Sequence, residues 1–197
     1  MSPVSWILLV VLLLLLFWAI GAFNRLTRLK NAIANAFGQI DVQLKRRYDL
    51  IPNLVEVARK YLAHEAQTLE AVIAARNQAH SAEQSAAASP LSAGAIGALG
   101  GAEQVLGGAL GRLFAVAEAY PDLKADQTMR ELSEELASTE NRIGFARQAY
   151  NDHVLEFNDA AAQFPTLIVA RLFNFQTQPM LASTTSEAER QPVKVAF

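Results

Sequence analysis

The sequence contains no cysteine and only three histidines. The absence of cysteine excludes disulfides, thiolate metal ligands and a thiol nucleophile, and it leaves the redox compartment open. The net charge of −2 argues against a general nucleic-acid binder, because such proteins carry a clear excess of basic residues. A chain of 197 residues that is 52% hydrophobic suits one domain with an anchor.

Motifs of familiar catalytic chemistry are also absent. The stretch HEAQT at His64 lacks the second histidine of a zinc-protease helix, and no Glu-x-x-His pair supports a carboxylate di-iron site. The stretch GGALG at 107–111 fits neither a P-loop nor a dinucleotide-binding loop. We therefore predict no catalytic residue, no metal site, no cofactor and no enzymatic activity.

The first long stretch of the chain lacks charge altogether. No charged residue lies between Val4 and Phe23, and these 20 residues would form a helix of roughly 30 Å, enough to cross a bilayer. Trp6 and Trp18 lie near its ends, where aromatic side chains favour the membrane interface. A cleaved signal peptide is the alternative. The length of the run and the lack of Lys or Arg before it favour a retained anchor over 4–23.

The flanking charges predict an orientation for this anchor. Arg25, Arg28 and Lys30 follow it, whereas no basic side chain precedes it. Basic flanks tend to stay in the cytoplasm. We expect a single-pass membrane protein with its N-terminus outside and its body in the cytoplasm.

The body reads as helices interrupted at a polar stretch. Apolar residues recur at helical spacing on both sides of KRRYD (45–49), which is followed by Pro52. Asp49 suits an N-cap, Pro52 suits a first helical turn, and the basic residues suit the C-terminal end of a preceding helix. These signals predict a corner between two helices at Asp49–Pro52, and a kinked continuous helix is the alternative.

The rest of the chain predicts two more helices. The second helix should fade near His80, and the Ala-, Ser- and Gly-rich stretch 81–102 is typical of a mobile linker. A short third helix follows, and a long fourth helix should run from about Asp122 until Pro165 ends it. Residues 25–60 carry eight basic and three acidic side chains, whereas 122–159 carry nine acidic and four basic ones. Antiparallel packing of these two segments is therefore expected.

Two long blocks carry a resemblance to a known family. QIDVQLKRRYDLIPNLVEVARKYLAHE and YPDLKADQTMRELSEELASTENRIGFARQAYNDHVLEFN resemble the LemA family of bacterial membrane proteins. The resemblance implies a membrane-anchored helical bundle over 24–175 and little about activity; 176–197, outside the strong match, would be a flexible tail. The residues that match the first motif are Asp41, Lys45, Arg46, Arg47, Asp49, Pro52 and Asn53. Those that match the second are Tyr120, Pro121, Leu123, Lys124, Glu140, Asn141, Arg147, Tyr150 and Asn151. Asp126 stands where the family often has Asn, at an expected helix cap.

Together with the resemblance, these observations predict an all-α scaffold or assembly module that is anchored in the bacterial inner membrane and self-associates. One alternative is a regulator or sensor that presents its basic corner to an unidentified membrane protein. A hydrolase built on an acid such as Glu140 is a weaker alternative, because no paired base or metal set accompanies it.

The stretch PTLIVARLFNF (165–175) is strongly apolar but too short to cross a bilayer. It either caps the bundle core of its own chain, packs on a neighbouring protomer or rests on the membrane. An up-down-up-down path would return it to the membrane end of the bundle. We predict that Leu172, Phe173 and Phe175 help the protein to form oligomers.

Overall fold

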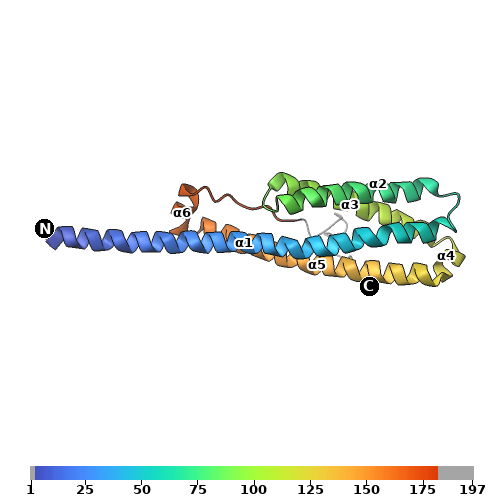
Figure 1. Cartoon of the computed structure of the whole chain (residues 1–197), viewed down its shortest axis with the longest axis horizontal. Helices are drawn as coiled ribbons and strands as arrows, with labels where there is room; N and C mark the ends of the chain where they lie inside the picture. The colour runs from blue at the N-terminus through green and yellow to red at the C-terminus, as the bar shows by residue number, and fades with distance from the viewer. Residues whose placement is uncertain (1–2, 182–197) are drawn as a thin grey trace, which may run out of the picture.

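The computed structural model describes residues 3–181, which form six helices and no strand. In chain order the helices are α1 (Pro3–Arg59), α2 (Ala66–Ala88), α3 (Ala93–Ala117), α4 (Pro121–Ala125), α5 (Gln127–Ala162) and α6 (Thr166–Leu172). The long helices alternate in direction: α1 leads away from the N-terminal end, α2 returns, α3 leads away and α5 returns (Figure 1). The predicted all-α fold, an apolar N-terminal helix leading into an antiparallel bundle, is confirmed.

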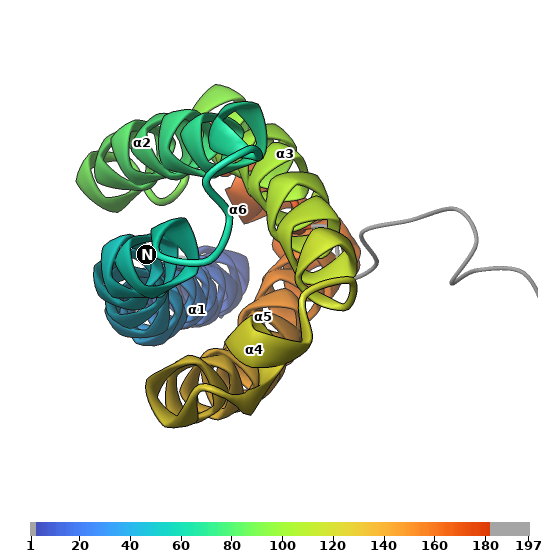
Figure 2. The ribbon, with the colours of Figure 1, turned by 90° about the vertical axis from the view of Figure 1, so that its right-hand side faces the viewer.

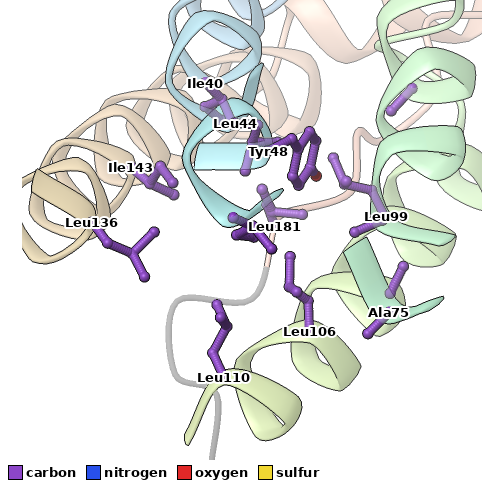
Figure 3. Packing of buried hydrophobic residues seen from close by; sticks show 14 of the residues in the cluster. Ile40, Leu44, Tyr48, Ala75, Leu99, Leu106, Leu110, Leu136, Ile143 and Leu181 are labelled. Atoms are coloured by element: carbon purple, nitrogen blue, oxygen red, sulfur yellow. The ribbon is translucent and has the colours of Figure 1, made fainter. Parts of the chain in front are cut away.

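Helix α1 is the central element of the bundle. Both α2 and α5 pack on it, and α3 packs mainly on α2, so the other helices curve around α1 when viewed end-on (Figure 2). Its residues Ile40, Leu44 and Tyr48 lie in the core with Leu99 of α3 and Ile143 of α5 (Figure 3). Burial of such side chains contributes about 25 cal/mol per Å² of apolar surface, so the buried stripe of α1 stabilises the bundle along its length.

The predicted corner at Asp49–Pro52 is wrong, because α1 runs unbroken from Pro3 to Arg59. Its buried stripe continues from Leu44 through Arg47, Tyr48 and Ile51. A charged side chain at a core position makes the apolar pattern look interrupted where the helix is not.

Pro52 is accommodated inside α1 by a side chain from α2. A proline lacks the N–H that would bond the carbonyl four residues earlier, which here belongs to Tyr48. Arg76 Nε donates to this Tyr48 carbonyl oxygen at 3.1 Å. The buried carbonyl therefore keeps a partner, and the helix avoids the cost of an unsatisfied polar group.

The first turn of the bundle lies further along the chain, between Arg59 and Ala66. This stretch, KYLAHE, contains neither glycine nor proline. Leu62 is buried, and its amide donates to the Ala58 carbonyl oxygen at 2.9 Å. The turn thus closes the end of α1 over an apolar side chain, and no helix-breaking residue marks it.

The linker expected at 81–102 is largely helical. Helix α2 continues to Ala88, a short turn containing Pro90 follows, and α3 begins at Ala93 with the Ser92 hydroxyl accepting from the Ala95 amide. The flexible composition is overruled by packing, because residues of this stretch are buried between the two helices, namely Ala86, Ile96, Leu99 and Ala102. The third helix is therefore much longer than predicted.

The long fourth helix of the prediction is divided at Asp126 into α4 and α5. Asp126 caps α5, as expected: its carboxylate accepts from the Met129 amide and from the Tyr61 hydroxyl, each at 2.9 Å. Helix α5 ends at Ala162, ahead of Pro165, as predicted. The antiparallel pairing of the basic and acidic segments is also confirmed, because Arg46 and Arg47 of α1 pair with Glu135 and Glu140 of α5.

Candidate functional site

Arg47 connects three helices at the centre of the bundle. Its side chain, on α1, is 4% exposed and forms ion pairs with Glu103 of α3 and Glu140 of α5. The Tyr48 hydroxyl donates to the same Glu103. Burial raises the pKa of Tyr48, which keeps the phenol protonated as a donor. A buried charge with such partners is costly to disturb, since removing one partner leaves the other uncompensated.

A pocket of about 290 Å³ opens beside this cluster, with walls from α1, α3 and α5. Its polar lining is formed by Arg47, Glu103, Gln104, Glu140 and Arg147. Burial and the neighbouring Arg47 lower the pKa of Arg147. Gly107 and Gly111 of α3 line the pocket, and a Cβ at either position would lie in open space.

The charges around this pocket largely balance one another. The two arginines are accompanied by two glutamates, and Glu140 is bound to Arg47. An arrangement of this kind can fix the relative positions of α1, α3 and α5. Among the described residues that line the pocket, no nucleophile lies beside a general base, the combination that covalent or acid–base catalysis requires.

A second polar cluster joins α1 to α2. Lys45 Nζ lies 2.7 Å from the Asp41 carboxylate and 3.7 Å from that of Glu83, whose side chain is fully buried. Burial and the nearby Asp41 carboxylate raise the pKa of Glu83 to about 7. Burial opposes ionisation of Asp41 too, but hydrogen bonds with Glu83 and Lys45 lower its pKa overall. A proton shared by the two carboxyl groups would give a hydrogen-bond partner to one oxygen of each.

The segment after α6 is tied along α5 by two asparagine side chains. The Asn158 amide group exchanges two hydrogen bonds with the Gln178 backbone, at 3.0 and 2.8 Å. Asn151 does the same with Leu181, at 2.8 and 2.9 Å. The Tyr150 hydroxyl donates to the Pro179 carbonyl oxygen, and burial raises the pKa of Tyr150 to about 12. Residues 176–181 are thus held on the bundle; 182–197, the remainder of the expected tail, lie outside the described residues.

Comparison with known sequences identifies the family. A sequence model of the LemA family matches residues 36–197. The chain belongs to the LemA family. The match begins within α1, beyond the apolar stretch, and it includes Arg47, Glu103 and Glu140 together with 176–197.

Curated relatives of this LemA chain are magnetosome proteins by name. The magnetosome protein MamQ of Magnetospirillum gryphiswaldense is 28% identical over 151 residues, which cover 69% of this chain and 56% of the relative. The magnetosome protein MamQ 2 of Paramagnetospirillum magneticum matches with the same identity and coverage. The chain therefore spans little more than half the length of these relatives.

The residues that suggested the LemA family from the sequence do not form one site. Arg47, Glu140 and Arg147 meet at the pocket, and Asp41 and Lys45 meet at Glu83. Tyr150 and Asn151 bind the segment after α6. The others stand apart: Arg46 pairs with Glu135 at the surface, and several side chains are exposed or lie at the far end of the bundle, namely Asp49, Pro52, Asn53, Asn141, Tyr120, Pro121 and Lys124.

Sequence reasoning missed three residues that complete these clusters, namely Glu103, Glu83 and Arg76. Glu103 and Glu83 lie within the stretch taken for a linker or at its edge. A lone acid in a stretch of Ala and Gly was the available signal for Glu103. Arg76 lies at helical spacing from Leu69 and Val72, which places it on the same face of α2, but its role depends on the carbonyl that Pro52 leaves free.

Metal binding was not expected, and residues 3–181 hold no group of three or more His, Asp or Glu side chains placed to bind a metal ion. Among the described helices, α1 alone contains a stretch long and apolar enough to cross a membrane, judged by length and composition. Only 6% of that stretch is buried, unlike the core helix of a soluble bundle.

Proposed function

We propose that this LemA protein is a non-enzymatic scaffold, anchored in a bacterial inner membrane, that assembles into homo-oligomers with its body in the cytoplasm. The observation that carries the proposal is the continuity of α1. One helix of 57 residues, roughly 85 Å long, is apolar and exposed over its first part and forms the centre of the bundle over its last part. A bundle mounted in this way stands at a fixed distance along α1 from the membrane span.

A scaffold holds its binding surface in a rigid arrangement, and the buried charges of this bundle support such rigidity. Arg47 holds α1, α3 and α5 together, and Arg76 keeps α1 intact at Pro52. The relatives are named as magnetosome proteins, a description that names no reaction. Exposed apolar side chains on the bundle surface, such as Val42 at 58% and Phe145 at 74%, offer contacts for another copy.

The regulator alternative receives less support from the contacts. It relied on a basic corner presented to a partner, but Lys45 and Arg46 are paired with Asp41 and Glu135, and Arg47 is buried. The hydrolase alternative relied on Glu140, whose carboxylate is bound to Arg47.

The test is cross-linking of the full chain in its membrane, with single cysteines introduced at surface positions such as Phe145. The native chain contains no cysteine, so every cross-link reports the introduced residue. A ladder of homo-oligomers supports the proposal. A monomer cross-linked to a stoichiometric second protein would favour the regulator instead, and a monomer alone at every position would contradict self-association.

Orientation is tested with a reporter joined after Phe197. Activity of a reporter that works only in the cytoplasm supports the proposed topology. Activity of a reporter that works only outside the inner membrane would overturn it.

A further inference from the structure

Helix α6 lies against the part of α1 where the uncharged stretch ends. Ring centroids of Phe173 and Phe23 are 4.9 Å apart, and those of Phe175 and Phe23 are 5.6 Å apart. Phe175 also contacts Phe157 of α5, and Val169 and Ala170 are the buried residues of α6. The inner face of α6 and Phe175 thus cap the core of their own chain, which is one of the roles expected from the sequence.

The outer face of the same segment is apolar and exposed. Phe164, Ile168, Leu172 and Phe173 are 82%, 56%, 76% and 53% exposed. Ile168 and Leu172 lie four residues apart on one face of α6, Phe164 lies in the turn before this helix, and Arg171 is exposed next to Leu172. Soluble surfaces rarely carry such a contiguous apolar patch without a partner. We call these four apolar residues the α6 patch.

The continuity of α1 fixes the height of the α6 patch. Phe23 is the last residue of the uncharged stretch, and the exposed Arg25 and Arg28 follow it. When Val4–Phe23 spans the hydrocarbon core, Phe23 lies at its edge and the two arginines lie among the headgroups. Figure 1 shows α6 beside α1 at the end of the bundle that faces this bare stretch. The α6 patch extends the apolar surface of the span sideways, because Phe173 is in contact with Phe23.

We propose that the α6 patch rests in the lipid interface, with its four apolar side chains at the acyl boundary and Arg171 on the phosphate of an anionic lipid. Short amphipathic segments bind bilayers in this manner, through buried apolar area and attraction to anionic headgroups. The lipid is favoured over a second copy, because a patch at this height meets the bilayer of its own anchor first. This second attachment restricts rotation and tilt of the bundle about α1.

This proposal rests on the proposed anchoring of Val4–Phe23, so the experiment measures both the membrane insertion of that span and the lipid contact of the α6 patch. Single-cysteine variants of the full chain, Leu172→Cys, Leu13→Cys and Phe145→Cys, carry an environment-sensitive fluorophore. Each is reconstituted into vesicles of zwitterionic and anionic phospholipid, with a nitroxide quencher placed near the headgroup or near the end of the acyl chain. Phe145 is the matched control, since its side chain is 74% exposed on α5 and Leu172 is 76% exposed.

The expected result is strong quenching at Leu172→Cys by the shallow nitroxide, at least about twofold above that at Phe145→Cys, as for a side chain at the interface. Leu13→Cys should respond most to the deep nitroxide. Quenching at Leu13→Cys with none above control at Leu172→Cys would overturn the lipid contact and leave the anchor standing. Energy transfer between labelled Leu172→Cys copies without lipid quenching would show that the α6 patch contacts a second protomer, and it would also overturn the proposed lipid contact. No quenching at Leu13→Cys would contradict the proposed membrane span, and with it the lipid contact of the α6 patch.

Discussion

In two neighbouring regions of the chain, the local sequence signals predict the opposite of the structure that each region adopts. Residues 45–53 carry a charged stretch, a suitable cap and a proline, yet they lie inside α1. Residues 60–65 carry no proline or glycine, yet they form the turn to α2. The difference shows that local signals yield to packing where partners exist. The first region stays helical because Arg47 forms ion pairs with two carboxylates and the Tyr48 carbonyl oxygen accepts a hydrogen bond from Arg76.

The largest effect is expected from replacing Arg47 in the first region, with the same replacement of its neighbour Arg46 as the comparison. Arg47→Met leaves Glu103 without its buried cationic partner, although the Tyr48 hydroxyl still donates to it, and should lower the free energy of unfolding by about 3–5 kcal/mol. The same change at Arg46, which is 58% exposed in its pair with Glu135, should cost no more than about 1 kcal/mol. Denaturant unfolding of both variants in mild detergent checks this. Equal losses would mean that Arg47 does not hold the first region.

The next effect depends on pH and concerns Glu83, which faces the same region from α2. Because the pKa of Glu83 is raised to about 7 from an ordinary 4.5, the folded state favours the protonated acid. Its stabilising contribution is present below pH 4.5 and is lost as the pH rises through about 7. Relative to Glu83→Gln, the native chain should lose up to about 3 kcal/mol of stability across this range. Parallel pH profiles of the two proteins would contradict the assignment.

Arg76 and Pro52 should be energetically coupled. Arg76→Met leaves the buried Tyr48 carbonyl unsatisfied and should cost about 1–3 kcal/mol. In a Pro52→Ala background the new amide can donate to that carbonyl, so the same change at Arg76 should cost at least about 1 kcal/mol less. A double-mutant cycle measured by denaturant unfolding gives the coupling. Additive losses would show that Arg76 does not compensate for the proline.

The smallest effect compares the turn with a helix. Ala63, in the turn, and Ala74, in α2, are both exposed, so Ala→Gly at each position tests backbone preference alone. Ala74→Gly should cost about 1 kcal/mol, as for glycine in an exposed helix interior, whereas Ala63→Gly should be close to neutral. Thermal unfolding of the two variants measures the difference. Equal costs would indicate that residues 60–65 continue a helix.

Much of the fold could be predicted from periodicity. The span, the stripe on α5, the Asp126 cap and the antiparallel charge pairing are properties of short segments or of bulk charge, which a sequence displays directly. The corner was misplaced because Arg47 occupies a core position and because the partner of the Tyr48 carbonyl is 28 residues away. The stretch 81–102 was misread because burial between α2 and α3 outweighs the low order typical of Ala, Ser and Gly.

The candidate site was harder to predict than the fold. A resemblance supplied Arg47, Glu140 and Arg147, but Glu103 stands apart from both matching blocks and only the bundle brings it to Arg47. Asp49 and Asn53 were selected together with Arg47 although their side chains are exposed. Neighbours on a helix point in different directions, so closeness in sequence does not gather side chains into a site.

The central claim is that α1 is one helix from the membrane span to Arg59, and a single distance tests it most directly. Cysteines at Arg28 and Glu56, both exposed, accept spin labels in a chain that has no other cysteine. A continuous helix places these positions roughly 42 Å apart, at about 1.5 Å per residue. A corner at Asp49–Pro52 would fold Glu56 back and bring them to roughly 25 Å at the same rise per residue. Electron–electron double resonance on the reconstituted full chain should give a narrow distribution near the longer distance, and a distribution centred near the shorter one would contradict the account.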